Sequence, residues 1–221
     1  MKKTIPIIFL IVLVWGMAAC TPAPKNQNQA APQPAPPQAQ ENLQPQAAQP
    51  SISDYFPATP GSTWSYQGAG NEFASFTREV LYASARQAQI KEANGGTESA
   101  SIYEFSEGAL KRVYFQGESY QAVNLLAQGF KSNDSTVVLK EPLQTGHEWT
   151  TGNGQRKIVQ TDAQLQTPAS AFTNCIKVEI SEKNSSALIY EYYAQGVGLV
   201  KREFIDGGAT ISSTLEKYQV K

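Results

Sequence analysis

Residues that could serve as catalytic groups are scarce in this chain. Its one histidine, His147, precedes Glu148, and its two cysteines are Cys20 and Cys175. A histidine acts as a general acid or base only in a cleft beside an orienting partner, and a cysteine nucleophile needs a neighbouring base. His147 follows a glycine, as turn residues often do, and Cys175 lies in an alternating, strand-like segment. We interpret His147 as an exposed turn residue and Cys175 as a packing residue, and we predict no catalytic residue.

Metal, cofactor and nucleic-acid chemistry also lack their usual residues. One histidine and two cysteines are too few for a Cys/His zinc site. The carboxylates form no calcium loop, and neither a glycine-rich phosphate loop nor a G-x-S-x-G motif occurs. Nineteen acidic residues against 18 basic ones argue against a basic surface for nucleic acid. We therefore expect no enzyme activity, no cofactor, no metal and no nucleic-acid partner.

Aromatic side chains carry more functional information. There are ten tyrosines, nine phenylalanines and three tryptophans, and rings fall on both faces of consecutive strand-like segments. Because one face of a flat sheet would be solvated, this indicates that the second face is covered by protein or filled by a ligand such as a lipid, glycan or peptide. Tyrosine suits an amphipathic ligand. The expected lining residues are Tyr103, Tyr114, Tyr190 and Tyr192, with Tyr193 replacing Tyr192 if a bulge intervenes.

The elements that position these rings are strands. Apolar and polar residues alternate in short runs rich in Val, Ile, Thr, Tyr and Phe, separated by Gly, Asn and Pro clusters. The best helical candidate is the short segment 120–128. The pattern predicts an all-β, mainly antiparallel domain, built as a single strongly curved sheet or a half-open or closed β-barrel. The clearest strands are 62–67, 74–83, 100–106, 110–116, 135–140, 156–161, 171–181, 187–194, 197–205 and 210–220.

A weak internal repeat supports this interpretation. The segments 57–64 and 142–149 share P-x-x-x-G-x-x-W at identical spacing. Proline fixes the entry to a turn, glycine permits a positive φ, and tryptophan begins a strand as a large apolar anchor. We expect Trp64 and Trp149 to occupy equivalent, buried strand starts. An ancestral duplication of the whole domain is a further interpretation that the repeat leaves open.

The N-terminus has the order of a secretory signal peptide. Lys2 and Lys3 precede an apolar run, 5–15, and small residues lead to Cys20. The apolar run is shorter than a dependable membrane span, although an uncleaved anchor helix remains the alternative. The tetrad Met17-Ala18-Ala19-Cys20 resembles the signal of bacterial lipoproteins. That resemblance implies removal of residues 1–19 and attachment of diacylglycerol, with acyl chains such as palmitate, to the thiol of Cys20.

Two further expectations follow from this signal. Two or more acyl chains give stable anchoring, so the resemblance implies a protein held at the extracytoplasmic face of the cell membrane. With Cys20 lipidated, Cys175 has no disulfide partner.

Residues 20–50 contain the lipidated cysteine and a Pro/Gln/Ala-rich linker, whose composition is typical of disorder. Residues 51–221 form the β-rich extracytoplasmic domain.

Three segments also carry a family resemblance. They are YFPATPGSTWSYQGAGNEFASFTREV, TPASAFTNCIKV and YEYYAQGVGLVKREF. They resemble a family of uncharacterised β-rich lipoproteins from Gram-positive, mainly anaerobic bacteria. The shorter motifs P-x-x-x-G-x-x-W, T-P-A-x-x-F and Y-x-x-G-V-G-x-V are distantly similar to exported β-domains of unknown function and to lipoprotein-localisation carriers, which hold acyl chains in a half-barrel. The resemblance implies a fold and supplies no catalytic residue.

Two functions of different class fit these observations. One is a non-catalytic binding module for a hydrophobic or amphipathic envelope ligand, such as a lipid or glycan. The other is a structural component of the cell envelope that docks another envelope protein. An unfilled apolar cavity would favour the first, whereas a solid core with an exposed apolar patch would favour the second.

Overall fold

The computed structural model describes residues 50–152 and 154–221. The described residues form one compact unit, which is almost entirely β-structure. The expected signal peptide (1–19), Cys20 and the expected linker (20–50) apart from Pro50 lie outside the described residues. The elements are η1 (Ile52–Tyr55), β1 (Thr63–Ala69), β2 (Phe76–Ala83), β3 (Gln87–Asn94), β4 (Glu98–Ser106), β5 (Ala109–Gln116), α1 (Leu125–Gln128), β6 (Thr136–Lys140), β7 (Glu148–Thr151), β8 (Gly154–Gln166), β9 (Ala171–Glu182), β10 (Leu188–Ala194), β11 (Gly198–Asp206) and β12 (Ala209–Gln219).

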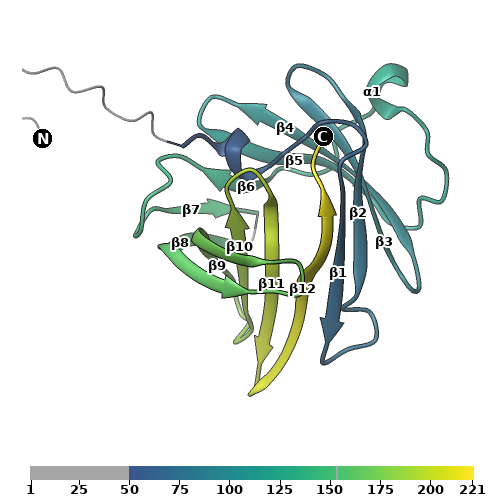
Figure 1. Ribbon diagram of the computed structural model, residues 1–221. Helices are drawn as coiled ribbons and strands as arrows, with labels where there is room; N and C mark the ends of the chain where they lie inside the picture. Colours follow the sequence, from purple (N-terminus) through teal and green to yellow (C-terminus); the bar gives the residue numbers. More distant parts are fainter. Residues whose placement is uncertain (1–49, 153) are drawn as a thin grey trace, which may run out of the picture. The chain divides into compact units, whose positions relative to one another are not determined.

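The twelve strands form one antiparallel, barrel-shaped sheet. Its order is β6-β5-β4-β3-β2-β1-β12-β11-β10-β9-β8-β7. Consecutive strands are therefore neighbours everywhere except between β6 and β7, and the first and last strands pair in the middle of the sheet (Figure 1). The all-β prediction is confirmed, and the architecture is a nearly closed barrel-shaped sheet.

Side chains from β7 and β8 join the two edges of the sheet. Val137 on β6 donates its backbone N–H to Oγ1 of Thr151 at 2.7 Å and accepts at its carbonyl the indole N–H of Trp149 at 2.9 Å. Arg156 on β8 also donates to the carbonyl of Val138, at 3.2 Å. The edge strands are short, and side-chain donors and acceptors satisfy part of their backbone.

The segment that precedes β1 closes one end of the sheet, here called the plugged end. Ile52, Tyr55 and Phe56 are all buried there. The Phe56 ring lies 4.8 Å from that of Tyr103, and the carbonyl of Asp54 accepts the N–H of Gly196 in the β10–β11 turn at 2.6 Å. The chain thus fills its own barrel at this end.

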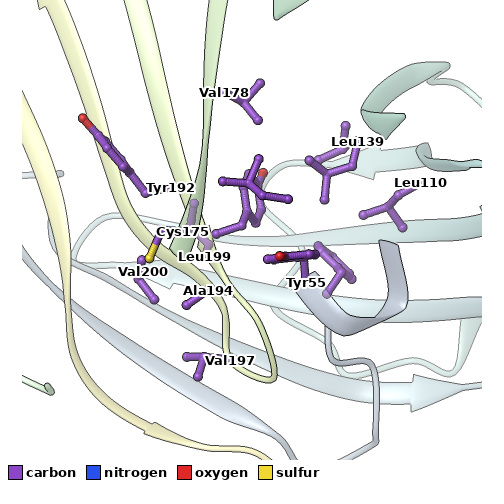
Figure 2. Close-up of a cluster of buried hydrophobic side chains, with 14 of the residues drawn as sticks. Tyr55, Leu110, Leu139, Cys175, Val178, Tyr192, Ala194, Val197, Leu199 and Val200 are labelled. Carbon is purple, nitrogen blue, oxygen red and sulfur yellow. The ribbon is translucent and has the colours of Figure 1, made fainter. Parts of the chain in front are cut away.

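The described interior is closely packed. Close-packed side chains from both halves of the sheet form the core (Figure 2). The space among Phe56, Trp64, Ile90 and Leu199 amounts to about 10 Å³, which is no more than one water molecule needs. Protein side chains therefore cover the inner face of the sheet, which was one of the two explanations for aromatic rings on both faces of the strands.

The P-x-x-x-G-x-x-W repeat marks two equivalent strand starts. Gly61 (φ 81°) donates its N–H to Val80 at 2.8 Å, and Gly146 (φ 91°) donates to Ile158 at 2.8 Å. The following residue accepts the return bond, at 3.0 Å in the first copy and 2.9 Å in the second. Trp64 and Trp149 are 4% and 5% exposed. The predicted equivalence and burial are confirmed.

Two strands were missing from the sequence prediction. β3 reads QAQIKEAN, mostly residues of low β-propensity, and it forms because it pairs with strands on both sides. β7 has only four residues. The helical candidate 120–128 shrinks to α1, a single turn whose Asn124 side chain accepts the N–H of Ala127. No helix in the described part of the chain has the length and apolar character needed to cross a membrane.

Candidate functional site

A carboxylate that accepts hydrogen bonds from three side chains lies on the inner face of the sheet. Glu191 on β10 accepts Nη1 of Arg156 at 3.0 Å, Nε of Arg202 at 3.0 Å and the hydroxyl of Tyr193 at 2.7 Å. The Glu191 side chain is only 6% exposed. A buried carboxylate is tolerated only when it is paired and hydrogen-bonded in this way.

A second ion pair lies on the same face. Arg78 on β2 and Glu92 on β3 are directly opposite in the β2–β3 ladder, and Nε of Arg78 donates to Glu92 Oε1 at 2.8 Å. The Arg78 guanidinium also lies 5.9 Å from the ring centroid of Phe56, which belongs to the plug. Three arginines and two glutamates therefore leave this inner cluster (Arg78, Glu92, Arg156, Glu191 and Arg202) with one excess positive charge.

The arginines of the inner cluster lower the pKa of its two carboxyl groups. Burial raises the pKa of Glu191, but Arg202, Arg156 and the Tyr193 hydroxyl outweigh burial and hold this pKa well below its usual range. Burial likewise raises the pKa of Glu92, and Arg78 and Arg202 reverse the shift, so the net direction is downward. Both carboxylates are therefore ionised at neutral pH.

Strand alternation explains why these side chains meet. Side chains at i and i+2 of a strand share a face. On β2, Arg78 shares a face with Phe76 and Val80, and on β3, Glu92 shares a face with Ile90. The same alternation puts Glu191 in phase with Tyr193. A charged residue at an alternating strand position that is otherwise apolar is the sequence signal from which the members of the inner cluster could have been recognised.

The inner cluster reaches solvent in a small cavity at the end opposite the plug, here called the cup. Its volume is about 190 Å³. In Figure 1 this end carries the β1–β2 connection and the β11–β12 turn, away from η1 and the C-terminus. The side chains of Arg202 and Glu92 are 35% and 27% exposed. The cup is lined by Phe73, Phe76, Glu92, Asn94, Thr97, Ser99, Arg202 and Ser213.

Aromatic rings form one side of the cup. Phe76 stacks on Tyr66 with centroids 4.2 Å apart, and the guanidinium of Arg202 lies 5.8 Å from the centroid of Phe76. Phe73, in the β1–β2 connection, is 53% exposed. The cup therefore presents an apolar surface beside a guanidinium, which suits a ligand with both apolar and charged parts.

A larger groove, of about 780 Å³, lies at the plugged end beside Pro50, Tyr55 and Pro142. The segment that forms one of its walls continues into residues 1–49, which lie outside the described residues. Among the residues that line this groove, Glu141 carries the one charged side chain, whereas the cup presents a guanidinium beside aromatic rings.

The structure does not bring all four of the tyrosines expected to line a ligand groove together. Tyr190 and Tyr192 do lie together on β10, where Nζ of Lys177 is 4.1 Å and 5.3 Å from their ring centroids. Tyr103 is 6% exposed and packs on Phe56 inside the sheet. Tyr190 and Tyr192 lie on the face of β10 opposite Glu191, and Figure 2 shows Tyr192 directed away from Val178 and Leu139. Their hydroxyls donate to Glu179 at 2.9 Å and Glu203 at 2.8 Å respectively.

The other residues of the expected groove have their own protein partners. Tyr114 packs edge-on against Phe130, with centroids 5.7 Å apart, and donates to Gln116. The β10–β11 ladder shifts register between Tyr192 and Tyr193, and Tyr193, 2% exposed, is the inward ring. The extra residue of this shift is Val200 on β11, and β10 pairs with β9 without a shift. Tyr193 therefore faces inward by regular alternation with Glu191, and not through the bulge on which the sequence alternative depended.

His147 and Cys175 lie apart from the cup. His147 lies in the turn before β7, as expected, but it is only partly exposed, and its Nε2 is buried without a hydrogen-bond partner among the described residues. The Trp149 ring, 5.7 Å away, explains part of this burial. Cys175 is fully buried, and burial raises the pKa of its thiol to about 11, which favours the unreactive thiol form. The prediction that Cys175 is a packing residue is confirmed.

Potential metal ligands are dispersed in the described part of the chain. Nowhere in residues 50–152 and 154–221 do three or more His, Cys, Asp or Glu side chains gather as a metal site would need. The carboxylates nearest the cup, Glu92 and Glu191, already accept bonds from arginines. The cup therefore offers a guanidinium, not a set of metal ligands.

Comparisons with known proteins give two similar solved structures. One is a protein from Bacteroides fragilis described as exported and as having a YmcC-like fold, with 16% identity, a TM-score of 0.47, and coverage of 75% of this chain and 98% of that one. The other is a protein from Parabacteroides distasonis described as a lipoprotein, with 16% identity, a TM-score of 0.45 and the same coverage. Neither source supports the Gram-positive origin that the sequence resemblance implied. No family model and no curated protein matches the chain.

Proposed function

We propose that this chain is a non-catalytic, lipid-anchored binding protein of the cell envelope that holds part of an amphipathic ligand in the cup. The observation that carries the proposal is the cup itself, which is lined both by the exposed ring of Phe73 and by Arg202, whose guanidinium lies 5.8 Å from the Phe76 ring. A volume of about 190 Å³ accommodates a head group and a few carbons. This volume is too small for a whole acyl chain, so the ligand would be held at one end only.

The chemistry of the described residues supports a non-catalytic role. The thiol of Cys175 is buried with a raised pKa, and the buried Nε2 of His147 has no orienting partner within the described residues. A general base needs hydrogen-bond access to the proton it removes. Neither group lines the cup.

The test of binding uses the full chain in a non-ionic detergent and six-carbon amphiphiles followed by calorimetry. We expect saturable binding with a Kd of about 1 mM or below, as a fragment of this size can reach. Phe73→Ala should weaken binding at least about fivefold. Tyr120→Ala, which removes a 63% exposed ring outside the cup, is the matched control and should leave binding unchanged. Absence of saturable binding for every amphiphile would reject the proposal.

Anchoring through Cys20 is part of the same proposal. Its support is the small-residue tetrad that ends at Cys20 and the membrane affinity that two or more acyl chains provide. Cys20→Ser should leave an unlipidated precursor that no longer partitions into the detergent phase. A variant that still partitions and runs at the processed size would contradict it, whereas Cys175→Ser should partition as the wild type does.

A structural or protein-docking role is the second candidate, and a specific observation favours it. The core is solid, and Phe73, Phe115 and Phe204 are each more than a third exposed. In that case the exposed rings would bind an envelope protein and the small amphiphiles would not bind. The Gram-positive source remains an expectation from the sequence resemblance alone.

A further inference from the structure

We infer that the cup selects a carboxylate monoanion as the head group of its ligand, with Arg202 as the residue that binds it. This inference rests on the proposed function and names the chemistry of its ligand. It begins with the unbalanced charge of the inner cluster, whose three arginines face two glutamates. Among these five side chains Arg202 is the arginine that lines the cup.

Arg202 has donors left over for a ligand. A guanidinium carries five N–H donors, and Arg202 directs Nε and Nη2 at the same oxygen of Glu191, at 3.0 Å and 2.9 Å. The remaining donors belong to a side chain that is 35% exposed at the cup. A planar guanidinium matches a carboxylate, which can accept two of its N–H groups in parallel.

Glu191 keeps Arg202 in place. Arg156 donates to the second oxygen of Glu191 at 3.0 Å, and Tyr193 donates to that same oxygen at 2.7 Å. Glu191 is therefore fixed from both sides, so the guanidinium of Arg202 is held before a ligand arrives. Preorganisation of this kind reduces the entropy lost on binding.

The two glutamates limit the charge of the ligand. Glu92 also lines the cup and is 27% exposed, so a dianion beside Arg202 would meet a like charge. A single negative charge matches the excess charge of the inner cluster, while a cation would be repelled by Arg202. Phe73 and Phe76 then receive the carbons next to the head group.

The test compares head groups on one chain length. We would titrate the full chain in a non-ionic detergent with hexanoate, hexyl phosphate, hexylammonium and hexanol at pH 7.5. We expect hexanoate to bind at least about tenfold more tightly than hexanol or hexylammonium, and more tightly than hexyl phosphate, with an affinity that falls as salt rises. These comparisons need no variant, so they do not depend on the stability of a mutant.

Variants then assign the preference to Arg202. Arg202→Gln should remove the preference for hexanoate over hexanol, and Arg202→Lys should restore part of it. Arg86→Gln, which removes an exposed arginine between β2 and β3 at the opposite end, is the matched control and should keep the preference.

The outcomes separate the two proposals. Equal binding of hexanoate and hexanol, or tighter binding of hexyl phosphate or hexylammonium, would overturn the carboxylate inference and leave the cup as a binding site. Retention of the full preference in Arg202→Gln would also overturn it. Failure of every probe to bind would reject the proposed function itself.

Discussion

The inner cluster shows how single residues can depart from the pattern of their strand. Arg78, Glu92 and Arg202 occupy phases that alternation reserves for apolar side chains. Alternation alone predicts which face a residue takes, but it does not reveal that five such residues from five strands meet. Their meeting depends on strand register across the whole sheet, which one sequence does not specify. The same limit explains why the four tyrosines were assigned to one groove.

Glu191 should be the most sensitive member of the inner cluster. Glu191→Gln would leave Arg156 and Arg202 without their counter-ion, and breaking a buried pair of this kind costs about 3–5 kcal/mol. Urea unfolding of the full chain measures the loss. The matched control is Glu79→Gln, which disrupts the partly exposed 3.8 Å pair with Lys91 and should cost less than about 1 kcal/mol. Similar losses in both variants would contradict the structural role of Glu191.

The lowered pKa of Glu191 also predicts how stability depends on pH. A carboxylate whose pKa is depressed in the folded state stabilises the fold above its unfolded pKa, near 4.5. That contribution declines as pH falls below this value and is lost once the folded pKa is passed. The difference in unfolding free energy between wild type and Glu191→Gln should therefore shrink from about pH 4.5 towards pH 3. A constant difference over this range would show that the pKa is not lowered.

At the scale of elements, the alternation of apolar and polar residues and the turn-forming residues predicted most of the fold. Two of the glycine-containing clusters that separate the strand-like runs, Asn94-Gly95-Gly96 and Asp206-Gly207-Gly208, form the β3–β4 and β11–β12 turns, because glycine and asparagine supply the backbone angles of tight turns. β3 could not be recognised, since its strand character comes from its neighbours. The seam between β6 and β7 was equally hidden, because side chains and not a ladder join those edges.

The two anchor tryptophans provide a test at this scale. Trp64→Ala and Trp149→Ala each remove a large buried side chain, so each should cost about 3–5 kcal/mol in urea unfolding. Each also loses an indole hydrogen bond, to Val197 at 2.7 Å or Val137 at 2.9 Å. Phe73→Ala, at a 53% exposed ring, is the control and should cost less than about 1 kcal/mol. Fluorescence of the folded chain near that of free tryptophan would argue against burial.

At the scale of the whole domain, the barrel-shaped sheet is stabilised by its own N-terminal segment. Sequence reasoning assigned residues from 51 onward to the domain, and Ile52, Tyr55 and Phe56 are buried in the plug. It did not foresee that this segment fills the end of the barrel, because short apolar runs carry no sign of where they pack. The plug begins directly after residue 49, and the cup lies at the opposite end of the sheet.

The last prediction follows from this arrangement of plug and linker. Deleting residues 26–48 removes Pro/Gln/Ala-rich sequence that has too few large apolar side chains to form a core, and the melting temperature should stay within about 1 °C of the wild type. Extending the deletion through residue 56 would also remove Ile52, Tyr55 and Phe56, which are at most 6% exposed. Losing three buried side chains costs several kcal/mol, so the melting temperature should fall by at least about 10 °C. Equal melting temperatures for the two deletions would show that the plug does not stabilise the sheet, and a fall with the shorter deletion would place part of the linker on the domain.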